Sequence, residues 1–511
     1  MKTKTVILAV LLALALSFSA YARGGRAAVP ADTLIVGVPA MPVNLDPSLA
    51  NDPNSARVIV QIYNTLIHLN YDNVTEPSLA ERWEWVDPAN PIELRVFLRR
   101  GVRFHNGDEL RASDVQFSLD RAAASPVVAM IANMIHSTRV VNDFEVIIRL
   151  DFPFVPFVHY LGHNALSIVS ERAVREMGVE AHSRAPVGTG PYRLVNIVDG
   201  DRVELVRWDG FWGAPAPIQN LVFRFIPDVA TRLIALETGE VHIALAIPPV
   251  DMPRVRNNPN LTLYTGSIFA THMILFNTQR SPFNDIRVRH AIRHALDMDN
   301  LVDAVFLGAW PRSDGIVNYK VWGSVANELP PFEFNPARAR QLLAEAGFPN
   351  GFTTSIFIDQ GNPQRADMAE LMQHRLGAIG ITMSIVVMEM GVFLSRTAAG
   401  DFDIMISSWN SVTGEADYGL FPVFHSSSWG AAGNRARYSN PEVDRLLDLG
   451  RRTTDTTALL RIFRDAQFII HNDTPWIPMV AAAEIIGVRN EVRGFRVAPN
   501  QRHRYWTLSF R

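Results

Sequence analysis

Residues 98–110 read Leu98-Arg99-Arg100-Gly101-Val102-Arg103-Phe104-His105-Asn106-Gly107-Asp108-Glu109-Leu110. The apolar run 94–98 that leads into this stretch predicts a strand, and Asn106-Gly107 has the composition of a type I′ turn. Ser113-Asp114-Val115 follows shortly afterwards and predicts a helix that opens with an N-cap. A strand, a tight turn and a helix are therefore expected in immediate succession.

The composition narrows the class of protein. The chain has 511 residues, which is too long for one ordinary domain and predicts two or three. Its net charge of −3 gives no basic excess for binding nucleic acid. Cysteine is absent, which excludes disulfides, thiolate metal sites and a lipid-modified cysteine.

Residues 1–22 have the features of a cleaved secretory signal. Lys2 and Lys4 precede the apolar run 6–16, and the small residues of 17–22 suit a signal peptidase. A membrane anchor is the alternative, but the run is shorter than the ~20 residues that span a bilayer. A soluble exported protein without a lipid anchor is expected in the periplasm of a bacterium with two membranes.

Six segments further define the chain: 98–119, 186–192, 276–278, 282–289, 342–348 and 434–444. In this order they resemble family 5 of the extracytoplasmic solute-binding proteins that serve bacterial ABC importers, the dipeptide, oligopeptide and nickel-binding group. The dipeptide- and glutathione-binding members are the most similar. Gly188 and Gly190 in the second segment fit a tight turn, because a phosphate-binding loop would need a third glycine and a following helix.

The resemblance implies a periplasmic-binding-protein-like α/β fold with two lobes, a hinge and three domains. Domain I would combine residues 29–57, 185–267 and 488–511. Domain II would be an insertion of residues 58–184, and domain III would comprise residues 268–489. The hinge is expected near 265–267 and 487–489, where the lobes would close on a ligand.

The function that the resemblance implies is the capture of short peptides for delivery to a membrane permease, by a monomer without cofactor or metal. Other branches of the fold bind nickel chelates, haem or oligosaccharides, and these remain alternatives. An exported glycoside hydrolase is the remote alternative, with Glu415 and Asp417 as its paired carboxylates. The sequence has no Gly-x-Ser-x-Gly elbow, no P-loop and no His-Glu-x-x-His motif, so no enzymatic activity is expected.

The expected binding loop follows a predicted strand at 403–408. In open α/β sheets the carboxyl end of a strand faces the ligand crevice, which would place Trp409 and Asn410 there as a wall. The resemblance implies that Asp417, or as second choice Glu415, pairs with the ligand's ammonium. The alternative is a solvated acidic loop with Trp409 in the core.

Two further groups of residues are predicted to contact ligand. Met41 follows the first strand, and Thr271 and His272 lie in a segment that precedes another strand. A ligand carboxylate would require an arginine. At the position in segment 357–365 where dipeptide binders carry that arginine, the nearest match is Asp359, so Arg365 or Arg435 is the candidate.

Overall fold

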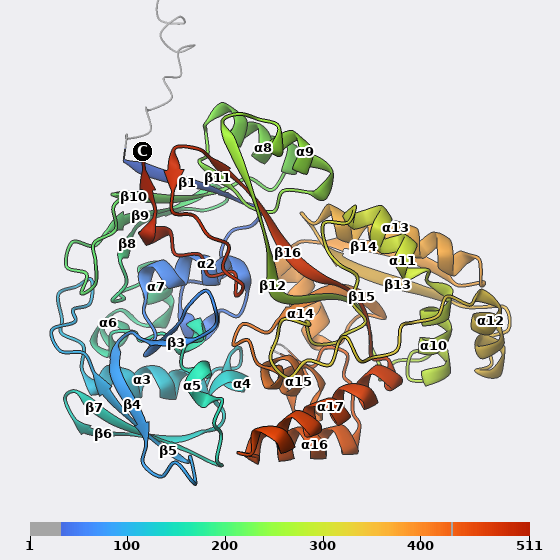
Figure 1. Ribbon diagram of the computed structural model, residues 1–511, viewed down its shortest axis with the longest axis horizontal. Coiled ribbons are helices and arrows are strands. Elements are labelled where there is room, and N and C mark those ends of the chain that lie inside the picture. The colour runs from blue at the N-terminus through green and yellow to red at the C-terminus, as the bar shows by residue number, and fades with distance from the viewer. Residues whose placement is uncertain (1–31, 431–432) are drawn as a thin grey trace, which may run out of the picture.

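The computed structural model describes residues 32–430 and 433–511 as two lobes joined by one sheet (Figure 1). The predicted signal sequence, residues 1–22, lies outside the described residues. The sheet has ten strands in the order β14-β13-β15-β12-β16-β11-β1-β10-β9-β8. Its β14 end belongs to the second lobe and its β8 end to the first, so the predicted α/β fold with two lobes is confirmed.

Two long antiparallel strands, β12 (Leu261–Phe276) and β16 (Trp476–Arg489), pass between the lobes. Their register shifts between Ser267 and Thr271, close to Ala270, where β12 begins to pair with β15. Each lobe therefore completes its part of the sheet with one half of the same two strands. The predicted hinge segments 265–267 and 487–489 lie on these strands, and the three-domain boundaries stay predictions.

The first lobe contains the β11-β1-β10-β9-β8 end of the ten-stranded sheet. It also contains a separate four-stranded sheet, β4-β5-β7-β6, which α3 covers. Three apolar cores fill the lobe, one under the four-stranded sheet and one on each face of its part of the ten-stranded sheet. Its elements are β1 (Thr33–Val38), α2 (Pro53–Ile62), β2 (Ile67–Leu69), β3 (Thr75–Pro77), β4 (Ala80–Trp85), β5 (Glu93–Leu98), α3 (Ala112–Ala123), α4 (Ala129–Ala132), β6 (Ile135–Asn142), β7 (Glu145–Leu150), α5 (Phe157–Tyr160), α6 (Glu171–Met177), α7 (Val179–Arg184), β8 (Tyr192–Val198), β9 (Arg202–Arg207), β10 (Asn220–Phe225), α8 (Val229–Thr238), β11 (Ile243–Ala244), α9 (Met252–Arg256), β17 (Val492–Arg493) and β18 (Ser509–Phe510).

The second lobe packs helices around the other end of the sheet, with one apolar core on each sheet face. Its elements are α10 (Ile286–Ala295), α11 (Met298–Phe306), α12 (Pro336–Glu345), β13 (Thr353–Asp359), α13 (Pro363–Gly377), β14 (Thr382–Met388), α14 (Met390–Ala399), β15 (Ile404–Asn410), α15 (Ala416–Phe424), α16 (Pro441–Arg452) and α17 (Thr456–Asp473).

The stretch 98–119 folds largely as predicted. The strand β5 and the helix α3 are confirmed, but α3 begins at Ala112, where the Arg111 backbone N–H donates to Asp114 Oδ2 at 2.9 Å. The turn is present, and Gly107 has φ +90°. Asn106 has no positive φ, so the predicted type I′ turn is wrong, since that type needs positive φ at both central residues.

Gly188 and Gly190 lie against the end of α2. The Gly190 N–H donates to the Ile62 carbonyl at 2.8 Å, and a Cβ on Gly188 would lie 2.1 Å from that same oxygen. The two glycines therefore permit close approach of backbones, which agrees with a structural role.

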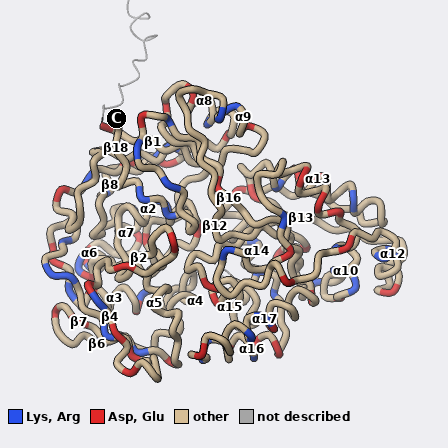
Figure 2. The backbone as a smooth tube through the Cα atoms, in the orientation of Figure 1, with Lys and Arg blue, Asp and Glu red and all other residues tan. Residues whose placement is uncertain are grey.

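Acidic and basic positions are interspersed in both lobes (Figure 2). Among residues 32–430 and 433–511, no helix combines the length and hydrophobicity that a membrane crossing requires.

Candidate ligand-binding site

A cavity of about 390 Å³ lies between the two lobes. The first lobe lines it with the start of α2, residues 163–164 and residues 501–502, and the second lobe lines it with β12, β15 and the loop 359–365. Its volume is within the range of pockets that enclose small molecules. The carboxyl ends of several strands lie at this cavity, which is where the sequence analysis expects a ligand crevice.

The cavity has an aromatic wall. Trp310, Trp409 and Trp476 line it, together with Tyr418. The Trp409 indole N–H donates to the Tyr418 carbonyl at 2.9 Å, which fixes the ring against the seam between the lobes. The indole nitrogens of Trp310 and Trp476 are buried and have no acceptor among the described residues. They leave two donors available to a ligand.

The charged residues lining the cavity are unequal in number. Five arginines line it against three carboxylates, among the residues that the structure describes: Arg57, Arg232, Arg365, Arg435 and Arg502 against Asp52, Asp359 and Glu484. An enclosed site with excess positive charge favours an anionic ligand, because buried charges require partners.

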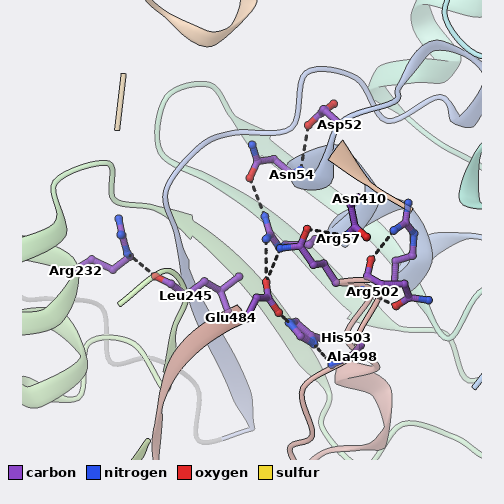
Figure 3. A network of polar contacts seen from close by, with 12 residues as sticks. Asp52, Asn54, Arg57, Arg232, Leu245, Asn410, Glu484, Ala498, Arg502 and His503 are labelled. Carbon is purple, nitrogen blue, oxygen red and sulfur yellow. Dashed lines mark hydrogen bonds and ion pairs between the residues drawn. The ribbon is translucent and has the colours of Figure 1, made fainter. Parts of the chain in front are cut away.

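One group of these charges forms a closed network (Figure 3). The Arg57 guanidinium donates to Glu484 Oε1 at 3.2 Å, and the other carboxylate oxygen lies 2.8 Å from His503 Nε2. Gln501 also donates to Glu484, at 3.0 Å. Burial opposes ionisation of Glu484, but His503, Arg57 and Gln501 together lower its pKa to about 2.

A second group is satisfied within the second lobe. Arg365 forms an ion pair with Asp359 and also donates to Ser408 at 3.2 Å. His272 packs edge-on against Trp310, with ring centroids 4.8 Å apart. Burial, aided by Arg365, lowers the pKa of His272 to about 3, so this ring is neutral at physiological pH.

The remaining arginines differ from one another. Arg232 is buried and donates to backbone carbonyls, including those of Leu245 and Ile226, so its role is structural. Arg435 donates to Thr397 at 3.0 Å, and burial lowers its pKa to about 10. Arg502 donates to Asn164 Oδ1 at 3.0 Å, and burial with the nearby Arg57 lowers its pKa to about 10.

The structure brings five of the nine predicted site residues to the cavity: Trp409, Asn410, His272, Arg365 and Arg435. Asn410 donates to Gln501 across the seam at 3.1 Å, and its side-chain oxygen has no partner among the described residues. Met41 packs against the first-lobe core, and Thr271 is buried in β12 beside the cavity. Neither of the two lines the cavity.

Asp417 and Glu415 lie at the seam between the lobes, outside the cavity lining. Asp417 is buried in α15 and bonded to Arg451 and to Tyr160 of the first lobe. Glu415 lies 3.3 Å from His159, also of the first lobe. Asp417 therefore links the two lobes through Tyr160, and neither carboxylate is carried into the proposed ligand set.

The ionisation of Glu415 is expected to make the free energy of unfolding depend on pH. Burial, and secondarily Asp417, raises its pKa to about 8. A folded-state pKa above the unfolded value means that stability is greatest below about pH 4.5 and decreases as pH rises toward 8. Glu415→Gln stays neutral and is expected to be more stable than the parent by roughly 1–4 kcal/mol at pH 8.5, and equal to it at pH 4.

Urea unfolding of both proteins at the two pH values tests this expectation. Burial lowers the pKa of His159, which favours the neutral form of that ring beside Glu415. If Glu415→Gln were less stable than the parent at both pH values, a charged His159–Glu415 pair would be the correct description instead.

Sequence reasoning missed Asp52, Arg57, Glu484 and Arg502. Asp52 has the local signature of a helix cap, and nothing in the sequence separates Arg502 from the many other arginines. These residues come together through tertiary contacts between distant parts of the chain. No local pattern could have found them.

Comparison with known proteins gives consistent matches. A family model described as bacterial extracellular solute-binding proteins, family 5 Middle, matches residues 74–431. A glutathione-binding protein, GsiB of Salmonella choleraesuis, is 31% identical over 483 residues and covers 93% of each chain. The periplasmic binding protein DppA of Helicobacter pylori, solved with the peptide STSA, superposes with a TM-score of 0.87 at 27% identity, covering 94% of this chain and 98% of that one.

The oligopeptide-binding protein AppA of Bacillus subtilis, solved with a nonapeptide, superposes equally well, with a TM-score of 0.87. It is 22% identical and covers 94% of this chain and 99% of that one, so the likeness concerns the fold alone.

Within the described ranges, no three or more His, Asp or Glu side chains gather in a way that could hold a metal ion.

Proposed function

The chain belongs to family 5 of the bacterial extracellular solute-binding proteins, and from this we propose that it captures a short anionic peptide of the glutathione type for an ABC importer. The family is one of non-enzymatic solute-binding proteins, so the ligand is expected to be released unchanged. Membrane permease subunits would receive it in the periplasm, and the protein would act as a monomer that closes its two lobes on the ligand.

The observation that carries this proposal is the excess of arginines over carboxylates in the enclosed cavity. Glutathione has two carboxylates and one ammonium, so its net charge is opposite to that of the cavity. The name of the relative from Salmonella choleraesuis and the peptide bound to the Helicobacter pylori protein support a short peptide as the ligand. The aromatic wall provides apolar surface for the peptide's backbone and side chains.

Calorimetric titration with reduced glutathione, the tetrapeptide Ser-Thr-Ser-Ala and tri-alanine tests this proposal. Glutathione is expected to bind at least ~10-fold more tightly than tri-alanine, because a second carboxylate meets a cavity with surplus positive charge. The recovered ligand should be intact by mass spectrometry.

Binding of a nickel–histidine chelate, haem or an oligosaccharide in place of all three peptides would show that the peptide assignment is wrong. Cleavage products that accumulate with protein and time would show that the protein is an enzyme.

A further inference from the structure

Asp52 is a cavity carboxylate that makes no ion pair with any other described residue. It precedes α2 as the N-cap, and its Oδ1 atom accepts from the backbone N–H groups of Asn54 at 3.0 Å and Ser55 at 2.9 Å. The second oxygen, Oδ2, makes none of these bonds. Of the three cavity carboxylates, Glu484 and Asp359 are paired with arginines, whereas Asp52 is not.

Arg57 is the nearest candidate partner for Asp52, but its guanidinium is directed elsewhere. It donates to Asn54 Oδ1 at 2.9 Å and to Glu484 at 3.2 Å, as Figure 3 shows. The burial of Asp52 raises the pKa of its carboxyl, against the opposing effect of its hydrogen bonds. A half-buried carboxylate that lines a cavity and has no ion-pair partner among the described residues is complementary to a ligand ammonium.

Arg502 is the opposite case: a guanidinium in the cavity wall without a carboxylate partner in the described part of the chain. Its hydrogen bonds go to the Asn164 side chain and to the Asn500 carbonyl, both neutral acceptors. It is half-buried and lines the cavity. Two unpaired charges of opposite sign therefore line the same cavity.

We propose that this cavity reads a zwitterionic peptide through Asp52, which binds the ammonium, and Arg502, which binds the C-terminal carboxylate. This assignment rests on the peptide-binding function proposed above. Both side chains line the cavity, and the hydrogen bonds that they make within the described ranges go to other residues, not to each other.

Both readers belong to the first lobe, one at the start of α2 and the other in the loop before β18. Their separation is consequently fixed before the lobes close. The second lobe contributes Trp409 and Asn410 when it closes over a ligand that the first lobe already holds.

Asp52→Asn tests the ammonium site with little effect on folding, since asparagine caps helices as well as aspartate. Calorimetry would use reduced glutathione, its N-acetyl derivative and its C-terminal amide, with the same modifications of Ser-Thr-Ser-Ala in parallel. We expect the parent to lose about 30-fold or more in affinity on N-acetylation. Asp52→Asn should bind the free amine about 30-fold more weakly and should lose this discrimination.

Arg502→Gln tests the carboxylate site in the same way. It should bind the free acid at least about 30-fold more weakly and should no longer distinguish the acid from the amide. The matched controls are Asp72→Asn and Arg496→Gln, both exposed and outside the cavity, which should behave as the parent does. Asp52→Ser replaces Asp52→Asn if the latter does not fold.

The outcomes separate the two proposals. If the parent binds one of these peptides and Asp52→Asn still prefers the free amine as strongly, the ammonium is read elsewhere and this inference fails alone. If Arg502→Gln still distinguishes acid from amide, the carboxylate assignment fails. If the parent binds none of the peptides, the proposed function fails and this inference fails with it.

Discussion

Asp417→Asn is expected to lower the free energy of unfolding by about 3–5 kcal/mol. Asp417 is 1% exposed, and Arg451 contacts both of its oxygens, through Nε to Oδ1 at 3.1 Å and through a terminal nitrogen to Oδ2 at 3.2 Å. The Tyr160 hydroxyl donates to Oδ2 at 2.5 Å. Asparagine would leave the Arg451 charge buried without a counter-charge, and that uncompensated charge is the main cost.

Urea unfolding of Asp417→Asn measures this effect, with Asp401→Asn as the control. Asp401 pairs with Arg396 at 2.6 Å but is 56% exposed, so its loss should cost under about 1 kcal/mol. The double variant Asp417→Asn with Arg451→Met should recover most of the stability, because both charges are then absent. A single variant with parental stability that loses its preference for a free amine would instead show that Asp417 reads the ligand.

Glu484→Gln is expected to have a comparable effect, about 3 kcal/mol or more at pH 7. The depression of its pKa to about 2 stabilises the fold by roughly 3 kcal/mol above the unfolded pKa near 4.5. Glutamine would remove the anion that balances Arg57 and leave that cation in an enclosed site. Because the folded pKa is the lower one, this contribution is lost as pH falls from about 4.5 through 2.

Thermal and urea unfolding between pH 3 and 7 would measure this contribution. The stability difference between parent and Glu484→Gln should shrink as the pH falls through this range. Glu84→Gln is the control, because Glu84 is 52% exposed in a surface pair with Arg82. A difference that stayed constant with pH would mean that Glu484 is not ionised in the folded protein.

The sequence predicts the scaffold well because its signals are local. Asn335 and Asn440 cap α12 and α16, and each stands directly before the proline that opens its helix. β15 ends at Asn410, so Trp409 and Asn410 reach the crevice as expected of residues at a strand's carboxyl end. These features depend on neighbours a few residues apart.

The charge assignments in the binding loop depend on distant residues and could not be predicted in this way. Asp417 does not line the cavity, and its carboxylate is bonded to Arg451, which is 34 residues further on in another helix. The proposed readers, Asp52 and Arg502, come from opposite ends of the chain. A pattern of residue types carries no information on which arginine will meet which carboxylate.

The paired strands β12 and β16 also determine the order in which the two lobes are completed during synthesis. The second lobe is one uninterrupted excursion that begins in β12 and ends in β16, so all its parts leave the ribosome together. The sheet of the first lobe stays incomplete until β16 has been synthesised, because β11 pairs with the last residues of β16. Arg502 and His503 emerge later still, and the half of the molecule that begins first is therefore the half that is completed last.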